Sequence, residues 1–264
     1  MLYIIGLGLY DENDISIKGL RAIEDCDEVY AEFYTAMLQG SSLSAIERRI
    51  GRTVKVLGRG EIEEERIPIE RASELDVALL VAGDPLVATT HTELLIDAHR
   101  RGIETRVIHS SSIISAAPGL AGLQAYKFGR IITIPFTADN YFPTSPYTNI
   151  GENLKAGSHS LVLLDIEAHR NRYMTASEGL RYLLKASEKL DDDTISGETL
   201  AVVIARAGSE KPLVRADRID VLVDEDFGDP LHCLVVPAGL HFIEAEYLVE
   251  IAGAPRAVVE RMII

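Results

Sequence analysis

The sequence predicts an α/β protein made of two lobes. Short apolar segments of strand length alternate along the chain with longer segments of helical periodicity, a pattern typical of sheets covered by helices. The 264 residues are 47% hydrophobic and 25% charged, which is an ordinary globular composition and enough for one large domain or two small ones. Several strand-like segments end in glycine, serine or aspartate, and open α/β sheets place their ligands at such ends.

In the first lobe we predict five strands with helices between them. The strands are apolar or β-branched segments at 2–9, 28–33, 53–57, 76–82 and 105–108. Ser16 is expected to cap the first helix, and Pro68 to interrupt a partly helical acidic segment. The predicted helices lie at 16–25, 43–50, 61–74 and 90–101. This alternation predicts a doubly wound α/β unit.

The second lobe is expected to start near Lys127, which gives domains of 1–126 and 127–264. Before it, the small and apolar residues at 113–123 predict a helix in which Pro118 and Gly119 are candidate kinks. The predicted strands of the second lobe lie at 130–135, 160–165, 200–205, 212–215 and 231–236. Its predicted helices lie at 147–155, 175–190 and 242–251. A second α/β unit follows from this pattern.

The net charge of −15 and the pI of about 4.9 limit the classes of partner. An acidic protein of this kind repels phosphate backbones, so direct nucleic-acid binding is disfavoured, whereas a basic face of a partner protein is compatible with it. Cys26 and Cys233 cannot form a disulfide framework or a cysteine-based zinc site, and they fit a reducing compartment. No apolar run approaches the roughly 20 residues of a membrane helix, so we expect a soluble, cytoplasmic protein without a membrane partner.

The segment 81–91, VAGDPLVATTH, is the strongest candidate for a ligand-binding loop in the first lobe. Gly83 permits a sharp turn or close approach of a ligand to the backbone, and Pro85 ends the strand. Asp84 is thereby placed at the carboxyl end of the strand. An ordinary strand-to-helix turn is the alternative, since Gly-Asp-Pro is common turn chemistry.

Two further strand ends in the first lobe have similar character. Gly6-Leu7-Gly8-Leu9 suggests a dinucleotide-binding loop, but the third glycine of that motif would fall at Asp11. These glycines either let the Leu9 backbone contact a ligand or serve close packing. The run from His109 to Ile113 contains three serines at the start of a predicted helix, where N–H groups and hydroxyls can bind a carboxylate or ribose. Helix capping explains at least one of those serines.

Three more strand ends occur in the second lobe, at Asp165, at Ala207 and before His232. A ligand pocket between the two lobes would need candidate strand ends in both of them, as the sequence has. No pair of histidines has the spacing of a helical zinc motif, and neither a P-loop nor a Gly-x-Ser-x-Gly elbow is present. Asp226-Phe227-Gly228 matches a kinase motif, but its companion motifs are lacking, so we interpret it as coincidence.

The combination of several motifs resembles the diphthine synthase family of archaea, within the tetrapyrrole-methylase superfamily. The resemblance covers nearly the whole chain, and the Gly-Asp-Pro turn alone is shared across that superfamily. The motifs are IIGLGLYDENDIS, AEFYT, GDPLVATTH, the serine run before Ile113, YKFG, FPTSPY, EDFGDP and FIEAEYLVEIAGAP.

The resemblance implies a class III methyltransferase of two α/β lobes with S-adenosylmethionine in the cleft between them, and usually a homodimer. It implies that the substrate is elongation factor 2, whose aminocarboxypropyl-modified histidine is methylated on its amine, three times in archaeal members, to give diphthine in diphthamide synthesis. S-adenosylhomocysteine would be the product, and no metal is expected. Carried over position by position, the cofactor contacts are Leu9, Asp84, Val87, Ser112, Ile113, Leu163, Ala207 and His232.

Methyl transfer from a sulfonium needs an aligned amine with a free lone pair more than it needs a strong acid–base constellation. Asp84, Asp165 and His232 are candidates for proton handling or cofactor orientation, but the sequence assigns none of them as a general base. Small residues such as Ala88 or Ala207 are candidates to leave room for a growing ammonium group. Two alternatives stay open: a methyltransferase for a corrin or porphyrin precursor, and a non-catalytic protein that binds an adenosyl ligand.

Overall fold

The computed structural model describes residues 1–34, 36–138 and 140–264; Thr35, the last residue of the AEFYT motif, and Asp139 lie outside them. The chain forms two compact units, one of Met1–Ile113 with Ile166–Arg172 and one of Ile114–Asp165 with Tyr173–Ile264. The division comes earlier than the boundary predicted between residues 126 and 127. The segment after residue 113 packs into the second unit, where the Tyr247 hydroxyl donates to the Leu120 carbonyl oxygen at 3.1 Å.

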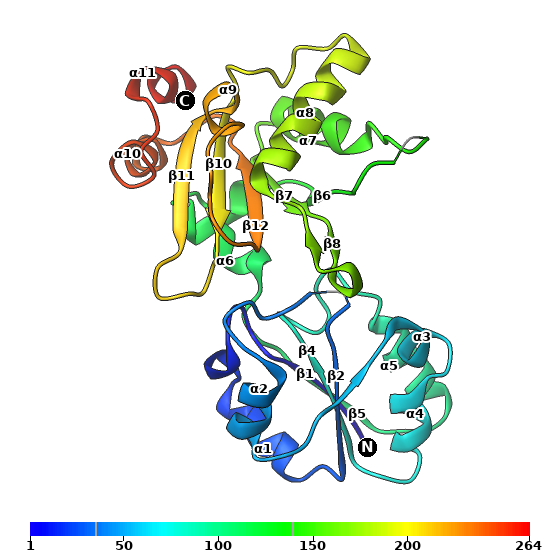
Figure 1. Ribbon diagram of the computed structural model, residues 1–264. Helices are drawn as coiled ribbons and strands as arrows, with labels where there is room; N and C mark the ends of the chain where they lie inside the picture. The colour runs from blue at the N-terminus through cyan, green and yellow to red at the C-terminus, as the bar shows by residue number, and fades with distance from the viewer. Residues whose placement is uncertain (35, 139) are drawn as a thin grey trace. The chain divides into compact units, whose positions relative to one another are not determined.

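The first unit contains a five-stranded parallel sheet in the order β3-β2-β4-β1-β5 (Figure 1). Its strands are β1 (Leu2–Gly6), β2 (Glu28–Glu32), β3 (Lys55–Leu57), β4 (Val77–Val81) and β5 (Thr105–Ile108). Its helices are α1 (Ile17–Glu24), α2 (Leu43–Ile50), α3 (Arg59–Glu63), α4 (Ile67–Ala72) and α5 (Thr92–Arg100). All five predicted strands are present, with ends that differ by a few residues.

Helices cover both faces of this sheet, as the alternation of strands and helices predicted (Figure 1). Since successive side chains of a strand point to opposite faces, Ile5 packs on one side with Ile23 of α1 and Ile46 of α2. Ile4 packs on the other side with Ile69 of α4, in a cluster that also contains residues of α3 and α5. The first unit is therefore doubly wound.

Two helix starts illustrate how local sequence sets these boundaries. The Ser16 hydroxyl accepts a hydrogen bond from the Gly19 backbone N–H at 3.0 Å, so the predicted cap of α1 is confirmed. Pro68 does not interrupt a helix: it lies in the first turn of α4, where its missing N–H has no intrahelical partner to lose. The acidic segment therefore forms two short helices, α3 and α4, which residues 64–66 separate.

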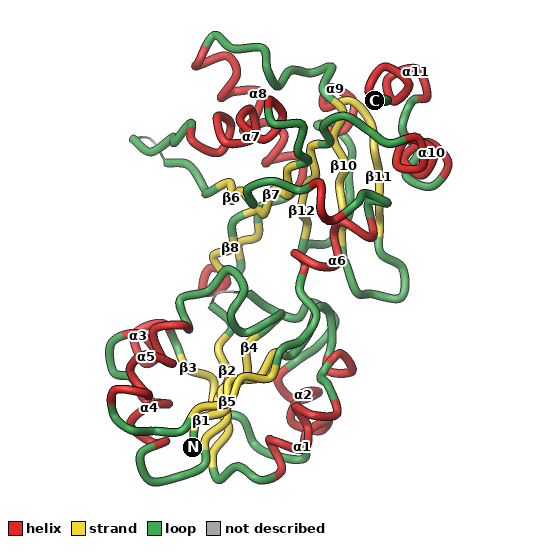
Figure 2. The backbone as a smooth tube through the Cα atoms, turned by 180° about the vertical axis from the view of Figure 1, so that it is seen from behind, coloured by secondary structure: helices red, strands yellow, loops and turns green. Residues whose placement is uncertain are grey.

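The second unit contains a mixed five-stranded sheet in the order β11-β10-β12-β7-β6 (Figure 2). Its strands are β6 (Ile132–Ile134), β7 (Ser160–Leu164), β10 (Leu200–Ala205), β11 (Leu213–Arg218) and β12 (His232–Val236). β6 and β7 are parallel, and every other pairing in this sheet is antiparallel. The helices are α6 (Ile113–Leu120), α7 (Ser145–Lys155), α8 (Ala176–Leu190), α9 (Ile219–Leu222), α10 (Phe242–Glu250) and α11 (Arg256–Val259).

Some short elements were not predicted from the sequence. They are α9, α11, the hairpin of β8 (Ile166–Glu167) and β9 (Arg172–Tyr173), and the 3-10 helices η1 (Glu12–Asp14), η2 (Ala125–Lys127), η3 (Ala168–Arg170) and η4 (Glu260–Met262). Each is too short to show a hydrophobic period. Among the described residues, no helix is both long and apolar enough to span a membrane.

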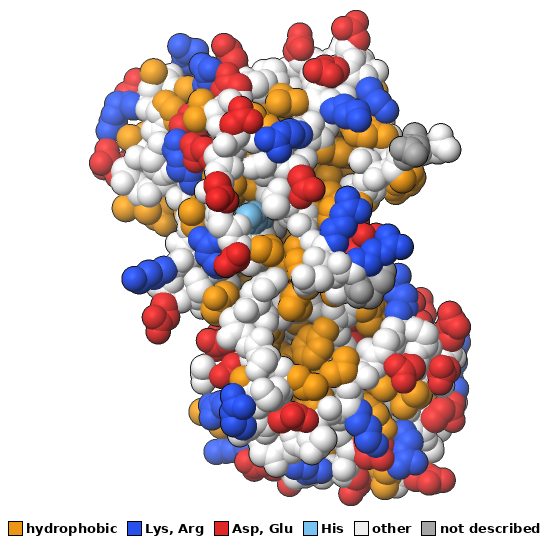
Figure 3. Space-filling view, in the orientation of Figure 1, with side chains coloured by type: hydrophobic (Ala, Val, Ile, Leu, Met, Phe, Trp, Pro, Cys, Tyr) orange, Lys and Arg blue, Asp and Glu red, His pale blue; other side chains and the backbone are white. Residues whose placement is uncertain are grey.

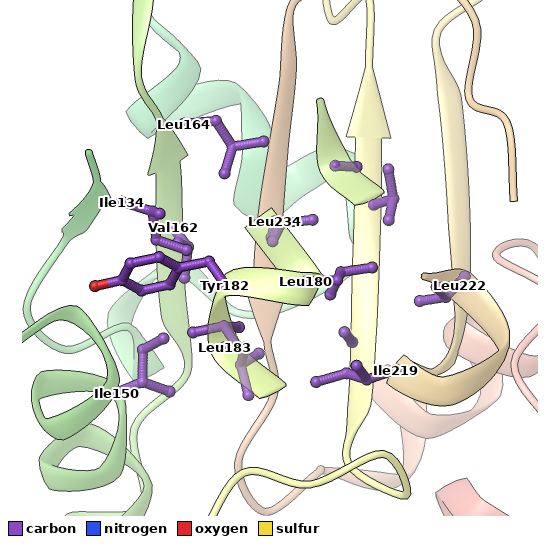
Figure 4. Packing of buried hydrophobic residues seen from close by; sticks show 14 of the residues in the cluster. Ile134, Ile150, Val162, Leu164, Leu180, Tyr182, Leu183, Ile219, Leu222 and Leu234 are labelled. Carbon is purple, nitrogen blue, oxygen red and sulfur yellow. The ribbon is translucent and has the colours of Figure 1, made fainter. Parts of the chain in front are cut away.

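The core of the second unit lies between its sheet and helices α7 to α9 (Figure 4). Val162 and Leu234 project from neighbouring strands toward Leu180 and Leu183 of α8, and all four side chains are fully buried. The second lobe was predicted as a further α/β unit, and this sheet covered by helices confirms it.

A buried charged cluster ties α10 to the segment before β6 within the second unit. The Glu244 carboxylate, 1% exposed, accepts hydrogen bonds from Lys127 Nζ at 2.5 Å and from the backbone N–H of Gln124 at 2.9 Å. His159 Nδ1 accepts from the Ala238 backbone N–H at 2.9 Å, so Nε2 bears the ring proton and faces Glu244 at 3.3 Å. Burial alone would raise the pKa of Glu244, but these donors outweigh it and lower that pKa to about 2.

Candidate functional site

In the first unit, the predicted contact residues follow three neighbouring parallel strands. β4, β1 and β5 are adjacent in the sheet, so their carboxyl ends lie along one edge. Asp84 and Val87 follow β4, Leu9 follows β1, and Ser112 and Ile113 follow β5. The structure therefore brings the five first-lobe candidates to the same edge of the sheet, where doubly wound folds bind ligands.

The Asp84 carboxylate links the loop after β4 to the loop after β5. It is 8% exposed and accepts hydrogen bonds from His109 Nδ1 at 2.8 Å and from the Ser110 backbone N–H at 3.2 Å. Its second oxygen accepts from the Leu86 backbone N–H at 3.1 Å, which closes the turn that Pro85 begins. Asp84 therefore fixes the shape of two loops of the candidate site.

Gly6 and Gly8 serve close packing. A Cβ on Gly6 would lie 2.6 Å from the Gly83 carbonyl oxygen and 2.7 Å from the Ser110 Cβ. Gly8 has a positive φ of 91°, and a Cβ there would lie 2.2 Å from the Asp14 Cβ. These distances show close packing at both glycines, and contact of the Leu9 backbone with a ligand stays a prediction.

Asp14 holds the loop after β1 in place. Its Oδ2 accepts hydrogen bonds from the backbone N–H groups of Leu9, Tyr10 and Asp11 at 3.1, 2.7 and 3.3 Å. Gly83 differs from the other two strand-end glycines because a Cβ there would meet nothing within 4 Å, although its φ of 74° favours glycine. The edge is thus packed tightly at β1 and is open at the turn after β4.

A buried acid and histidine lie behind the loop after β4. Glu32, the last residue of β2, is fully buried, and its Oε1 lies 3.6 Å from His91 Nε2. The other ring nitrogen, His91 Nδ1, is 3.1 Å from the Pro85 carbonyl oxygen and must donate to it. This contact holds the two ends of the GDPLVATTH loop together, and within the loop Ala88 has a strained φ of 56°.

In the second unit, the remaining candidates also lie at one sheet edge. β12 is antiparallel to both β7 and β10, so its start lies beside their carboxyl ends. Cys233 is in register with Leu163, and His232 is in register with Ala205, two residues before Ala207. Leu163, Ala207 and His232 are therefore brought together within this unit.

The proton-handling candidates of the second unit are both engaged in hydrogen bonds within that unit. His232 Nδ1 accepts from the Ala176 backbone N–H at 3.1 Å, so Nε2 bears the proton and donates to the Asp229 carbonyl oxygen at 3.0 Å. Burial lowers the pKa of His232, which keeps the ring neutral. Asp165 Oδ2 accepts from the Phe136 backbone N–H at 2.8 Å and so joins two strand ends.

Three supporting residues were missed by the sequence analysis: Asp14, Glu32 and His91. A signal was available for His91, because it closes the GDPLVATTH motif, and for Glu32, because a carboxylate inside an apolar strand is unusual. Asp14 had no distinguishing signal in an acidic, polar loop. Among the described residues, no group of three or more His, Cys, Asp or Glu side chains is placed to hold a metal ion.

A fold of two α/β units with candidate residues at strand ends is found in a known class of methyltransferases. The model of the family Tetrapyrrole (Corrin/Porphyrin) Methylases matches residues 1–222, and the chain belongs to this family. Its membership confirms the predicted fold class and makes the chain a methyltransferase.

Relatives place the chain more narrowly, among the diphthine synthases. It is 96% identical over 264 residues to the diphthine synthase of Methanothermobacter thermautotrophicus, with 100% of each chain covered. It is 47% identical over 256 residues to the diphthine synthase of Methanosphaera stadtmanae, with 97% of each covered. A crystal structure of diphthine synthase matches with a TM-score of 0.89 and 41% identity, over 99% of each chain. The resemblance found in the sequence motifs is thereby confirmed.

Proposed function

We propose that this chain transfers methyl groups from S-adenosylmethionine to the amine of the aminocarboxypropyl-modified histidine of elongation factor 2, and that it does so three times to give diphthine. The observation that carries the proposal is the 96% identity to a diphthine synthase over the full length of both chains. The acidic composition, with a net charge of −15, suits a basic face of a protein substrate. On the face shown in Figure 3, acidic and basic side chains are interspersed.

We propose that the methyl donor contacts the eight strand-end residues, and their chemistry fits such a ligand. When bound, S-adenosylmethionine supplies a methyl group on a positively charged sulfur. Five of the eight residues are apolar and half-buried, as is typical of residues that line small-molecule sites. They are Leu9, Val87, Ile113, Leu163 and Ala207. Within the first unit, a Cβ on Gly83 would meet nothing within 4 Å, so the turn after β4 is open at this position.

The chain's own residues bind and orient the methyl donor and leave room for the substrate amine. Asp84 holds two loops of the first unit in register, and His232 fixes the loop before β12. Ala88, which is exposed, and Ala207, which is half-buried, are small enough to leave volume for an ammonium that grows by one methyl at each transfer. We also propose a homodimer in the cytoplasm, where the two buried, free cysteines stay reduced.

The proposal is tested by incubating the protein with S-adenosylmethionine that carries a labelled methyl group and with elongation factor 2 bearing the aminocarboxypropyl group. Label is expected on the factor, and mass spectrometry should show up to three added methyl groups. Unmodified elongation factor 2 is the matched control and should stay unlabelled. Transfer to a tetrapyrrole precursor with none to the factor would contradict the proposal in favour of a small-molecule methyltransferase, and donor binding without any transfer would indicate a binding protein.

Replacing Asp84 with alanine is expected to weaken donor binding at least about tenfold, or ~1.4 kcal/mol. The variant loses the three hydrogen bonds that hold the loops after β4 and β5, while the sheet behind them is unaffected. Calorimetry with S-adenosylhomocysteine measures the affinity, and far-UV circular dichroism should be unchanged. Asp97→Ala, which removes a surface carboxylate of α5, is the control and should bind normally. Equal affinities of Asp84→Ala and the wild type would contradict the assignment.

A further inference from the structure

We propose that His109 accepts the proton of the substrate amine and that Asp84 positions its imidazole for that step. This inference rests on the proposed function and names the proton acceptor for the same site. His109 follows β5 directly and lies three residues before Ser112, one of the proposed donor contacts. It belongs to the first unit together with Asp84.

The proposed reaction requires such an acceptor for a simple electronic reason. A primary alkyl amine has a pKa near 10, so at neutral pH nearly all of it is ammonium without a lone pair. An acidic protein favours that cation further. Each of three successive transfers starts from an ammonium, so one proton must leave nitrogen before every transfer.

The contact between His109 and Asp84 sets the state of the imidazole. His109 Nδ1 lies 2.8 Å from Asp84 Oδ2, and an ionised carboxylate can only accept. Nδ1 therefore bears the ring proton, and in the neutral ring Nε2 keeps its lone pair. A carboxylate that fixes the tautomer of a histidine and faces it with opposite charge once it is protonated is the arrangement of general-base dyads.

Exposure separates the roles of the two residues. The Asp84 side chain is 8% exposed, whereas that of His109 is 68% exposed. No group within the described part of the chain hydrogen-bonds to His109 Nε2. The ring can thus be reached by a substrate amine and can pass its proton on to water, while the carboxylate behind it stays covered.

The other histidines near the strand ends cannot perform this step. Both ring nitrogens of His232 are engaged, one as an acceptor from Ala176 and one as a donor to Asp229. His91 is 1% exposed, and its Nδ1 is used by the Pro85 carbonyl. Among the described residues at the edge of the first sheet, His109 is the histidine that combines an orienting carboxylate with an accessible nitrogen.

The N–H bond of the ammonium breaks, its electron pair stays on nitrogen, and the proton binds His109 Nε2. The amine lone pair then forms the bond to the methyl carbon while the carbon–sulfur bond breaks, and that electron pair goes to sulfur. The products are a methylated ammonium, S-adenosylhomocysteine and an imidazolium, which returns its proton to solvent.

His109→Asn tests the step, because an asparagine amide can still donate to Asp84 but cannot accept the proton. The rate of the first methyl transfer is expected to fall by about 10²- to 10³-fold in single-turnover measurements. The Kd of S-adenosylhomocysteine, measured by calorimetry, should stay within about twofold of the wild type. The difference in transfer rate between His109→Asn and the wild type should become smaller as the pH rises toward the pKa of the amine, because the amine then loses its proton to water. Within the described part of the chain, Asp84 is the titratable group that forms a hydrogen bond with the His109 ring.

Three further measurements sharpen the test. His99→Asn, which removes another exposed histidine from α5 in the same unit, should transfer at the wild-type rate. Imidazole in solution should restore part of the activity of His109→Ala. In the protein without donor, nitrogen NMR should show the neutral His109 ring protonated on Nδ1, and Asp84→Asn should abolish that preference; protonation on Nε2 would overturn the inference without reference to activity.

The outcomes distinguish this inference from the proposed function. If the wild type transfers methyl groups and His109→Asn does so at the same rate and with the same pH profile, the inference about His109 is overturned. The proposed function is then unaffected. A fall in rate that is matched by a fall in donor affinity of tenfold or more would also overturn it, since His109 would then only shape the site. Absence of transfer to elongation factor 2 by the wild type would overturn the proposed function, and the inference with it.

Discussion

Replacing Glu244 with glutamine is expected to lower the free energy of unfolding by about 3 kcal/mol at neutral pH. The substitution leaves the Lys127 ammonium, 16% exposed, without its anionic partner and weakens the hydrogen bonds that join α10 to the segment before β6. Denaturation by urea, monitored by circular dichroism, measures the change. Glu246→Gln is the matched control, because it makes the same change at an exposed position of the same helix and should alter stability by less than about 0.5 kcal/mol.

The pH dependence of stability should change in the same variant. The pKa of Glu244 is about 2 in the folded chain, below its ordinary value of 4.5, so the unfolded chain binds the proton more readily. The contribution of Glu244 is therefore fully present above pH 4.5 and is lost as the pH falls toward 2. Burial lowers the pKa of His159 in the folded chain, so the unfolded chain binds this proton more readily as well. The stability therefore also falls as the pH drops below 6.5, the ordinary pKa of histidine. Glu244→Gln should flatten the acid limb between pH 4.5 and 2, and an unaltered limb would contradict this assignment.

Gly6→Ala is expected to have the second large effect, on the donor site of the first unit. The added Cβ would lie 2.6 Å from the Gly83 carbonyl oxygen and 3.0 Å from the Pro85 Cδ, too close for any of the three loops to keep its place. Relief by backbone movement typically costs about 1–3 kcal/mol of stability. Because the loops after β1, β4 and β5 are displaced together, the affinity for S-adenosylhomocysteine should fall by about tenfold or more.

Thermal unfolding and calorimetry measure these two quantities for Gly6→Ala. Gly60→Ala in α3 is the control, since a Cβ there meets nothing within 4 Å and alanine favours helix. That variant should be as stable as the wild type or more stable by up to about 1 kcal/mol, with normal donor affinity. Normal affinity in Gly6→Ala would show that the tight packing at β1 is not required for the site.

The strands of the first unit were predictable because each is a short apolar run with a period of two or a continuous buried face. β5 and α2 match their predicted bounds, Thr105–Ile108 and Leu43–Ile50. The role of Pro68 was not predictable from its presence alone, because proline interrupts a helix in the middle but begins one in the first turn. Local sequence does not say which of these two positions a proline will take.

The sequence could predict that the candidate residues lie at sheet edges, because they follow predicted strands. Parallel strands place their carboxyl ends together whichever strands are neighbours. The hydrogen bonds that shape each edge were not predictable, because Asp84 meets His109 only through the pairing of β1 with both β4 and β5. The same holds for Glu32 at the end of β2 and His91 directly before α5, which meet only in the folded chain.

The position of β1 has a consequence for synthesis of the chain on the ribosome. β1 lies between β4 and β5, and its first residue, Leu2, is in register with Val77 and Thr105. Because β1 precedes both of its neighbours in the chain, it cannot pair until the chain has grown past residue 77, whereas β2 can pair with β3 sooner. Closing a loop of that length is an entropic barrier, so the centre of the sheet is completed after its edge. Until then the apolar side chains of β1 stay exposed in the nascent chain, and we expect chaperones to bind the chain mainly during this period.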